Sequence, residues 1–75
     1  MLDEAEIQEL VRRAWDEGRS IDMGHLAERD RLLVWEMIAD LIEAHLPRLK
    51  TRTGRRPYVL IVRSHHQLRI ELREL

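Results

Sequence analysis

The histidine pair His65-His66 is the part of this chain whose residue types could do chemistry. Ser64 precedes the pair, and Arg63 and Arg69 flank it. An imidazole changes charge near neutral pH and can move a proton, while a guanidinium binds phosphate through several N–H donors. The segment therefore has the residue types needed for phosphate binding or RNA cleavage. The alternative is that these polar residues form an exposed turn without a chemical role. We favour this second interpretation.

The stretch from Val59 to Ile70 resembles the signature of HicA-type toxin ribonucleases, in which a strand leads into a Gly-Ser-His-His segment. The resemblance implies that His65 or His66 would be the catalytic position in RNA cleavage. It covers a short part of the chain and has two departures. Arg63 stands where that family has glycine, and two long helices are predicted before the hairpin. We therefore expect no catalytic residue and no enzyme activity.

The four histidines do not have the spacing of a metal site. His65 and His66 are adjacent, so in a strand their side chains would point to opposite faces. His25 and His45 would lie at opposite ends of one helix, about 30 Å apart at the standard rise per residue. The chain has no cysteine, which excludes disulfides and thiolate metal sites. Neither a metal nor a cofactor is predicted.

A basic connection over residues 47–57 is the second candidate site. It has several cations and no acid: Arg48, Lys50, Arg52, Arg55 and Arg56. Together with Arg63 and Arg69, these residues could neutralise the phosphates of a nucleic acid, contacts that supply affinity without reading sequence. No aromatic ring lies within residues 48–57 to stack on bases. Contact with an acidic protein surface and plain solvation therefore stay open as alternatives.

Charge is divided along the chain, although its formal total is only −1. Residues 1–46 have 12 acidic and 5 basic side chains, whereas residues 47–75 have 8 basic and 2 acidic ones. The acidic part opposes binding of a polyanion, while two oppositely charged parts suit contact with a protein. With 44% hydrophobic residues the chain is too apolar to be disordered, and we expect one small domain over residues 1–75.

Targeting and membrane segments are not expected. No apolar run approaches the roughly 18 residues that a membrane span requires, and the acidic N-terminus lacks the order of a signal peptide. We expect a soluble cytoplasmic protein without a membrane partner. Small, cysteine-free, charge-segregated chains are common among phage and mobile-element proteins, which is an association only.

The first predicted helix covers about residues 3–17. Its apolar residues recur at three- and four-residue spacing and form one stripe: Ile7, Leu10, Val11, Ala14 and Trp15. Asp3 is the expected N-cap and Gly18 the expected C-terminal stop. Glu9 and Arg13 have the spacing of an ordinary helix-surface ion pair. This helix should therefore bury its stripe against the rest of the domain.

The second predicted helix covers about residues 25–46 and is apolar around most of its circumference. Ser20 or Asp22 could cap it, and Pro47 ends it. Only a narrow polar stripe remains on it: Glu36, Asp40 and Glu43. A helix this apolar is buried on more than one side. One short helix and a small sheet can hardly cover it within a single chain of this length.

A C-terminal β-hairpin is predicted, with strands over about residues 58–64 and 67–74. The first strand is β-branched and aromatic, and it is apolar on both faces. In the second, Leu68, Ile70 and Leu72 alternate with charged residues. Leucines in this segment also have helical spacing, but Ile70 fits only the strand. The predicted fold class is therefore α+β, with helix-helix-strand-strand (ααββ) order.

These features predict a small intracellular protein-interaction domain: an adaptor, an assembly subunit or an inhibitor of a larger protein. We expect it to form a homo-oligomer, in the simplest case a dimer, through the second helix or strand edges. The expected interface residues are Trp35, Met37, Ile38, Leu41, Ile42, Val59 and Ile61. Trp15 is expected in the core, whereas Trp35 suits core and interface equally. The alternatives are a nucleic-acid-binding module that uses the basic residues of 48–69 and a small ribonuclease that uses His65 or His66.

Overall fold

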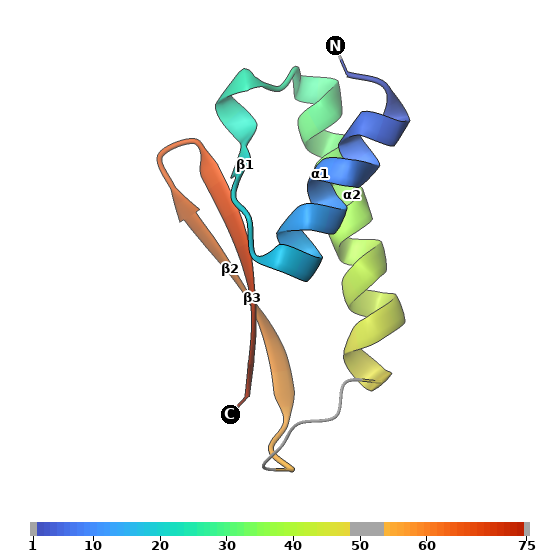
Figure 1. Cartoon of the computed structure of the whole chain (residues 1–75), viewed down its shortest axis with the longest axis vertical. Coiled ribbons are helices and arrows are strands. Elements are labelled where there is room, and N and C mark those ends of the chain that lie inside the picture. Colours follow the sequence, from blue (N-terminus) through green and yellow to red (C-terminus); the bar gives the residue numbers. More distant parts are fainter. Residues whose placement is uncertain (1, 49–53, 75) are drawn as a thin grey trace.

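The computed structural model describes residues 2–48 and 54–74 and has a helix layer packed on a sheet layer (Figure 1). Helices α1 (Glu4–Glu17) and α2 (Glu28–His45) come first in the chain. Strands β2 (Pro57–Ser64) and β3 (Gln67–Glu74) form the C-terminal hairpin. The predicted α+β class with ααββ order is confirmed, and residues 67–74 are a strand rather than a helix.

A third strand, β1 (Ile21–Asp22), extends the sheet, whose order is β1-β3-β2 with antiparallel pairing throughout. In β1, Ile21 pairs with Leu68 and Asp22 pairs with Gln67. Two residues are too few for a period-two pattern, so the sequence of residues 19–24 predicts a connection between the helices and not a strand. The added strand places β3 in the centre of the sheet and leaves β2 at an edge.

Helix α1 begins and ends at the residues that its sequence indicates. The Asp3 carboxylate accepts a hydrogen bond from the Glu6 N–H at 2.9 Å, which satisfies one of the free donors of the first turn. Gly18 ends the helix in the left-handed conformation, with φ of 70°, where a Cβ would be strained. Of the predicted stripe, Ile7, Val11 and Ala14 are buried, whereas Leu10 and Trp15 are half-buried and pack against the core.

Helix α2 begins at Glu28 rather than near residue 25, because the chain first makes a 3-10 turn, η1 (Met23–His25). The Asp22 carboxylate caps this turn by accepting from the Gly24 N–H at 3.0 Å. Asp22 is therefore a cap, as predicted, but it caps η1 and not α2. A second 3-10 turn, η2 (Leu46–Arg48), follows α2.

The core lies between the two helices and one face of the sheet. It includes Ile7, Val11 and Ala14 of α1, Val34 and Ile38 of α2, and Ile21, Leu26, Leu68 and Ile70. Antiparallel pairing places Val59 beside Leu72 and Ile61 beside Ile70, so these residues share the face that the helices cover. Both helices lie on this side of the sheet (Figure 1).

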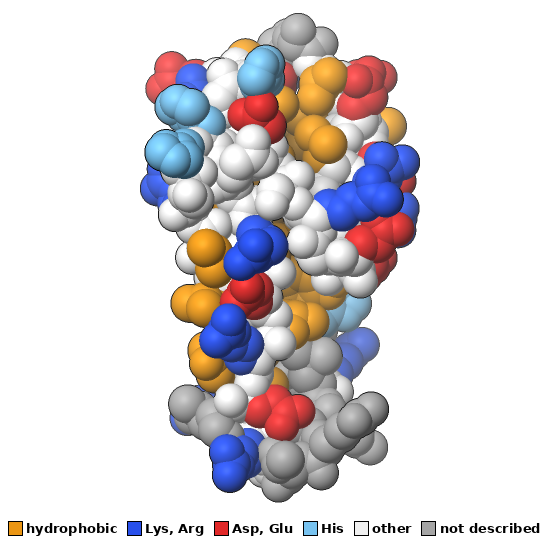
Figure 2. Space-filling model, turned by 60° about the vertical axis from the view of Figure 1, so that its left-hand side comes forward, with side chains coloured by type: hydrophobic (Ala, Val, Ile, Leu, Met, Phe, Trp, Pro, Cys, Tyr) orange, Lys and Arg blue, Asp and Glu red, His pale blue; other side chains and the backbone are white. Residues whose placement is uncertain are grey.

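The opposite face of the sheet is not covered by any described element. By the same register it presents an apolar row from β2 beside a charged row from β3, namely Tyr58, Leu60 and Val62 next to Arg73, Glu71 and Arg69. Figure 2 shows hydrophobic side chains beside a row of alternating charges on this side of the molecule. We call Tyr58, Leu60 and Val62 the outer stripe.

Candidate functional site

A small pocket lies where the hairpin turn meets the start of α2, and it has a volume of about 100 Å³. Its lining comes from η1, α2 and both ends of the hairpin turn: Met23, Arg31, Trp35, Arg63, His65, His66 and Gln67. We call it the turn pocket. Histidine side chains gather at the corresponding end of the molecule in Figure 2. The structure thus brings the chemically suggestive segment around His65 together with side chains that lie about 30 residues earlier in the chain.

The turn that holds His65 and His66 is fixed by its surroundings. Ser64 pairs with Gln67, so the two histidines form a two-residue hairpin loop. His65 has a positive φ of 56°, a conformation that costs free energy in any residue with a Cβ. The carbonyl of His66 accepts a hydrogen bond from the Met23 N–H at 2.7 Å. The main chain of η1 therefore ties the turn to the domain.

Two arginines, Arg31 and Arg63, line the turn pocket. The Arg63 guanidinium lies 6.0 Å from the centre of the Trp35 ring, within reach of a cation–π contact. Arg31 reaches the same pocket from the first turns of α2, and no carboxylate is among the described lining residues. The nearby Asp22 accepts from the Gly24 N–H and pairs with His25. The arrangement is suited to holding an anion.

The predicted basic residues do not form one surface. Arg55 and Arg56 precede β2, at the end of the long axis opposite the turn (Figure 1). The eight residues of β2 separate them from the turn by about 26 Å at the usual strand rise. Arg48 ends η2, while Lys50 and Arg52 lie outside the described residues. Among the predicted basic residues that the structure describes, only Arg63 reaches the turn pocket.

Arg69 belongs to the charged row of the outer sheet face. Its guanidinium donates to the Glu71 carboxylate at 2.8 Å, and Arg73 donates to the other oxygen of Glu71 at 2.9 Å. The hydrogen bond from Arg73, followed by that from Arg69, lowers the pKa of Glu71. Glu71 therefore already neutralises part of the positive charge that was predicted to contact a nucleic acid.

The predicted interface residues fall into different environments. Ile38 is only 1% exposed and belongs to the core of the single chain, so it offers no surface to a partner. The others are half-buried and pack against that core: Trp35, Met37, Leu41, Ile42, Val59 and Ile61. In β2 it is the alternate set, Tyr58, Leu60 and Val62, that faces away from the helices. The sequence shows that both faces of this strand are apolar. Only the pairing in the sheet shows which face lies toward the helices and which lies away from them.

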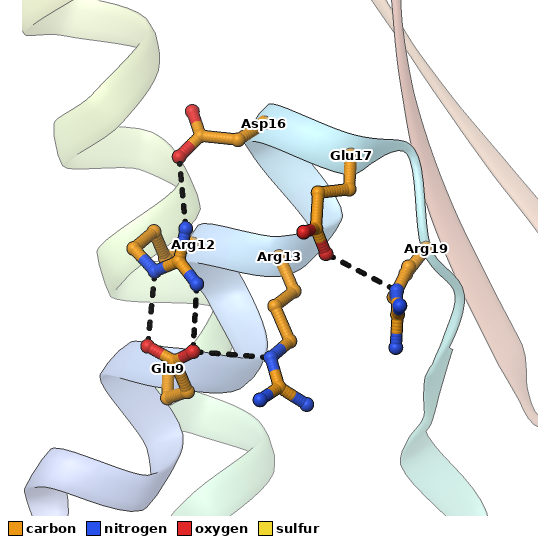
Figure 3. Close-up of polar contacts among 6 residues, drawn as sticks. All are labelled: Glu9, Arg12, Arg13, Asp16, Glu17 and Arg19. Carbon is orange, nitrogen blue, oxygen red and sulfur yellow. Dashed lines mark hydrogen bonds and ion pairs between the residues drawn. The ribbon is translucent and has the colours of Figure 1, made fainter.

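A second hollow, with a volume of about 660 Å³, lies between α1 and α2. Its apolar lining includes Val11, Trp15, Met37, Leu41 and Ala44. Trp15, which was predicted to be in the core, is half-buried here, and its ring centre lies 6.0 Å from that of His45. Arg12 and Asp16, which also line the hollow, form an ion pair with N···O of 3.4 Å (Figure 3).

Neither metal nor membrane features are found in the described part of the chain. Residues 2–48 and 54–74 contain no cluster of three or more side chains that could hold a metal ion. Within the same residues, neither helix combines the length and the apolar character needed to cross a bilayer. In comparisons with known proteins, no family model, no curated protein and no solved structure matches the chain. Proposals about function therefore depend on the geometry of its surfaces.

Proposed function

We propose that the chain is a small protein-interaction domain that self-associates through the exposed edge and outer stripe of β2. The observation that carries this proposal is the combination of an edge position and an apolar surface in one strand. β2 pairs only with β3 among the described strands, so its other edge has free main-chain donors and acceptors. Leu60, in the middle of the outer stripe, is 37% exposed.

The composition of β2 supports the same proposal. Natural sheets protect their edges with charged residues, proline or bulges, because an unprotected edge pairs with other chains. From Pro57 to Val62 the strand has no charged residue, and only Pro57 at its start is a protecting residue. The first charge is Arg63, near the turn. The central part of this edge is therefore suited to pairing.

A second copy of the chain is the occupant that fits this edge best. If β2 pairs antiparallel with its copy and Leu60 lies on the two-fold axis, Tyr58 lies opposite Val62 of the partner subunit. Such a register keeps both outer stripes on one side and both helix layers on the other. The charged row lies on β3, one strand away from the joint edge, so like charges do not meet at its centre. The dimer would pair the free edge of β2 and bring the two outer stripes side by side.

The test is the mass of the chain in solution, measured by sedimentation equilibrium over the micromolar range. We expect the wild-type chain to have twice its single-chain mass and Leu60→Lys to be monomeric, since a lysine on an edge strand opposes pairing. Leu32→Lys is the matched control, because Leu32 is 60% exposed but lies on α2. This variant should remain dimeric.

A wild-type chain that is monomeric throughout this range would contradict the proposal. The proposal would also be contradicted if Leu32→Lys were monomeric and Leu60→Lys remained dimeric. That result would place the contact on α2 instead. Circular dichroism of each variant establishes that the fold is retained, as expected for substitutions at exposed positions. A dimer of this kind would act by binding, as an adaptor, an assembly subunit or an inhibitor of a larger protein.

A further inference from the structure

We propose that the turn pocket binds a phosphate group, with Arg31 and Arg63 as its main ligands. Both arginines line the pocket, from α2 and β2 respectively, together with His65 and His66. A guanidinium has five N–H donors in a planar fork that matches the oxygens of a phosphate. This inference does not depend on self-association, because the pocket lies at the turn and not at the centre of the β2 edge.

The two arginines differ from the cations on α1 and on the outer sheet face. There, Glu9 pairs with Arg12 and Arg13, and Glu71 pairs with Arg69 and Arg73. Within the described residues, no carboxylate forms an ion pair with Arg31 or Arg63, and the aromatic face of Trp35 is the contact that Arg63 makes. Their donors are therefore available to an external anion.

The hairpin turn that forms one wall of the pocket is held in place before any ligand arrives. The hydrogen bond from the Met23 N–H fixes the carbonyl of His66. Gly24 packs so closely on this residue that an added Cβ would lie 2.9 Å from the Cβ of His66. The positive φ of His65 is a further constraint, of the kind that clusters at binding sites. A prearranged site loses less entropy on binding than a mobile one.

The size of the pocket limits what it can hold. Its volume is about 100 Å³, against about 660 Å³ for the hollow between α1 and α2. A pocket of this size suits a single phosphate group, and the rest of a larger ligand would lie outside it. We therefore assign the site to inorganic phosphate or the terminal phosphate of a small molecule. A nucleic-acid backbone would instead bind through many surface contacts. The experiment must distinguish this alternative from binding of a single phosphate group.

The experiment is an NMR titration of the full chain with inorganic phosphate at constant ionic strength. Saturable shifts are expected at the side chains of Arg31, Arg63, His65 and His66 and at the indole N–H of Trp35. Arg31→Gln and Arg63→Gln should each weaken binding about tenfold, because each removes charge-assisted hydrogen bonds. Arg69→Gln is the matched control and should leave the affinity unchanged, since Arg69 is paired with Glu71 outside the pocket.

Adenosine monophosphate, adenosine and an RNA tetranucleotide without a terminal phosphate complete the design. Binding of the monophosphate but not of adenosine supports the proposal. An absence of saturable shifts with phosphate would overturn it, as would an equal loss of affinity in Arg69→Gln and Arg63→Gln. Tighter binding of the tetranucleotide than of the monophosphate would also overturn it, in favour of a nucleic-acid surface. Because Arg31 and Arg63 are both exposed, their replacement should not prevent folding.

Discussion

At the scale of single residues, Asp30 is the most deeply buried charged side chain of residues 2–48 and 54–74, with 4% of its surface exposed. It lies in the first turn of α2, where a carboxylate suits the positive end of the helix dipole. One of its oxygens accepts a hydrogen bond from the Leu2 N–H at 3.3 Å. From the sequence it resembles any other acid at a helix start, because its partner is a main-chain group 28 residues away.

Replacement of Asp30 should therefore destabilise the domain. Asp30→Ala removes the acceptor for the Leu2 N–H and should lower the free energy of unfolding by about 1–3 kcal/mol. Asp30→Asn keeps an oxygen acceptor and should lose less. Urea denaturation measures both changes. An equal loss in the two variants would show that the charge, and not the hydrogen bond, is what matters.

Gly24 is a residue that close packing, rather than backbone conformation, requires to be glycine. An added Cβ would lie 2.9 Å from both Cβ and Cγ of His66 and 3.3 Å from an oxygen of Asp22. Because these contacts are too short, the hairpin turn would have to move away from η1. The chain thus depends on this position for the geometry of the turn pocket.

We expect Gly24→Ala to lower the free energy of unfolding by about 1–3 kcal/mol, the usual effect of overpacking. The midpoint of thermal unfolding should decrease in parallel. Ser20→Ala is a suitable control, because Ser20 is exposed in the connection before β1 and its loss should change stability little. An unchanged free energy of unfolding in Gly24→Ala would mean that the hairpin turn can move away from η1 without loss of stability.

At the scale of elements, α1 has an ion-pair cluster on its solvent face (Figure 3). The Glu9 carboxylate accepts from Arg12 at 2.7 and 2.9 Å and from Arg13 at 3.0 Å. The hydrogen bond from Arg12, followed by that from Arg13, lowers the pKa of Glu9 from 4.5 to about 2. The pair of Glu9 with Arg13 that the helix spacing predicts is confirmed, and Arg12 strengthens it.

The lowered pKa of Glu9 makes the stability of α1 depend on pH. Because the pKa is lower in the folded chain, the stabilising effect is present above pH 4.5 and is lost as the pH falls toward 2. We expect carboxyl NMR to place the Glu9 titration near pH 2 at low salt and Arg12→Gln to raise this pKa toward 4.5. High salt should have the same effect in a weaker form, since Glu9 and Arg12 are 45% and 52% exposed.

Arg19→Gln is the control for this titration, because Arg19 pairs with Glu17 at 3.1 Å and does not contact Glu9. It should leave the pKa of Glu9 unchanged. If Arg12→Gln also leaves the pKa of Glu9 unchanged, the hydrogen bond from Arg12 does not cause the lowering of that pKa.

In the hairpin, strand periodicity predicts which side chains of β3 face the core but not which side chains of β2 do. Alternation predicts that Leu68 and Ile70 face the core, and they are 1% and 4% exposed. In β2 the apolar residues are consecutive, so periodicity alone cannot assign them to the inner or the outer face. The assignment comes from pairing, since Ile61 lies beside the buried Ile70 and Leu60 beside the charged Glu71. The outer stripe is a consequence of that register.

At the scale of the whole molecule, the elongated shape keeps the candidate surfaces apart. The domain measures 42 × 24 × 17 Å, and the hairpin turn and the start of β2 lie toward opposite ends of its long axis (Figure 1). The basic half of the sequence is therefore spread along the hairpin and does not form a single patch in the described residues. Contact with an acidic partner and contact with phosphate would involve different ends.

The sequence by itself determined the local features: the caps and stripe of α1, the ααββ order, and the strand character of residues 67–74. Each of these depends on residues within a few positions of one another, where hydrogen-bonding and periodicity rules apply directly. The tertiary structure alone decided which face of β2 is exposed, that Asp30 is buried, and that Arg31 and Trp35 meet His65 and His66. These features join segments distant in the chain, and their geometry follows from how the helices pack on the sheet.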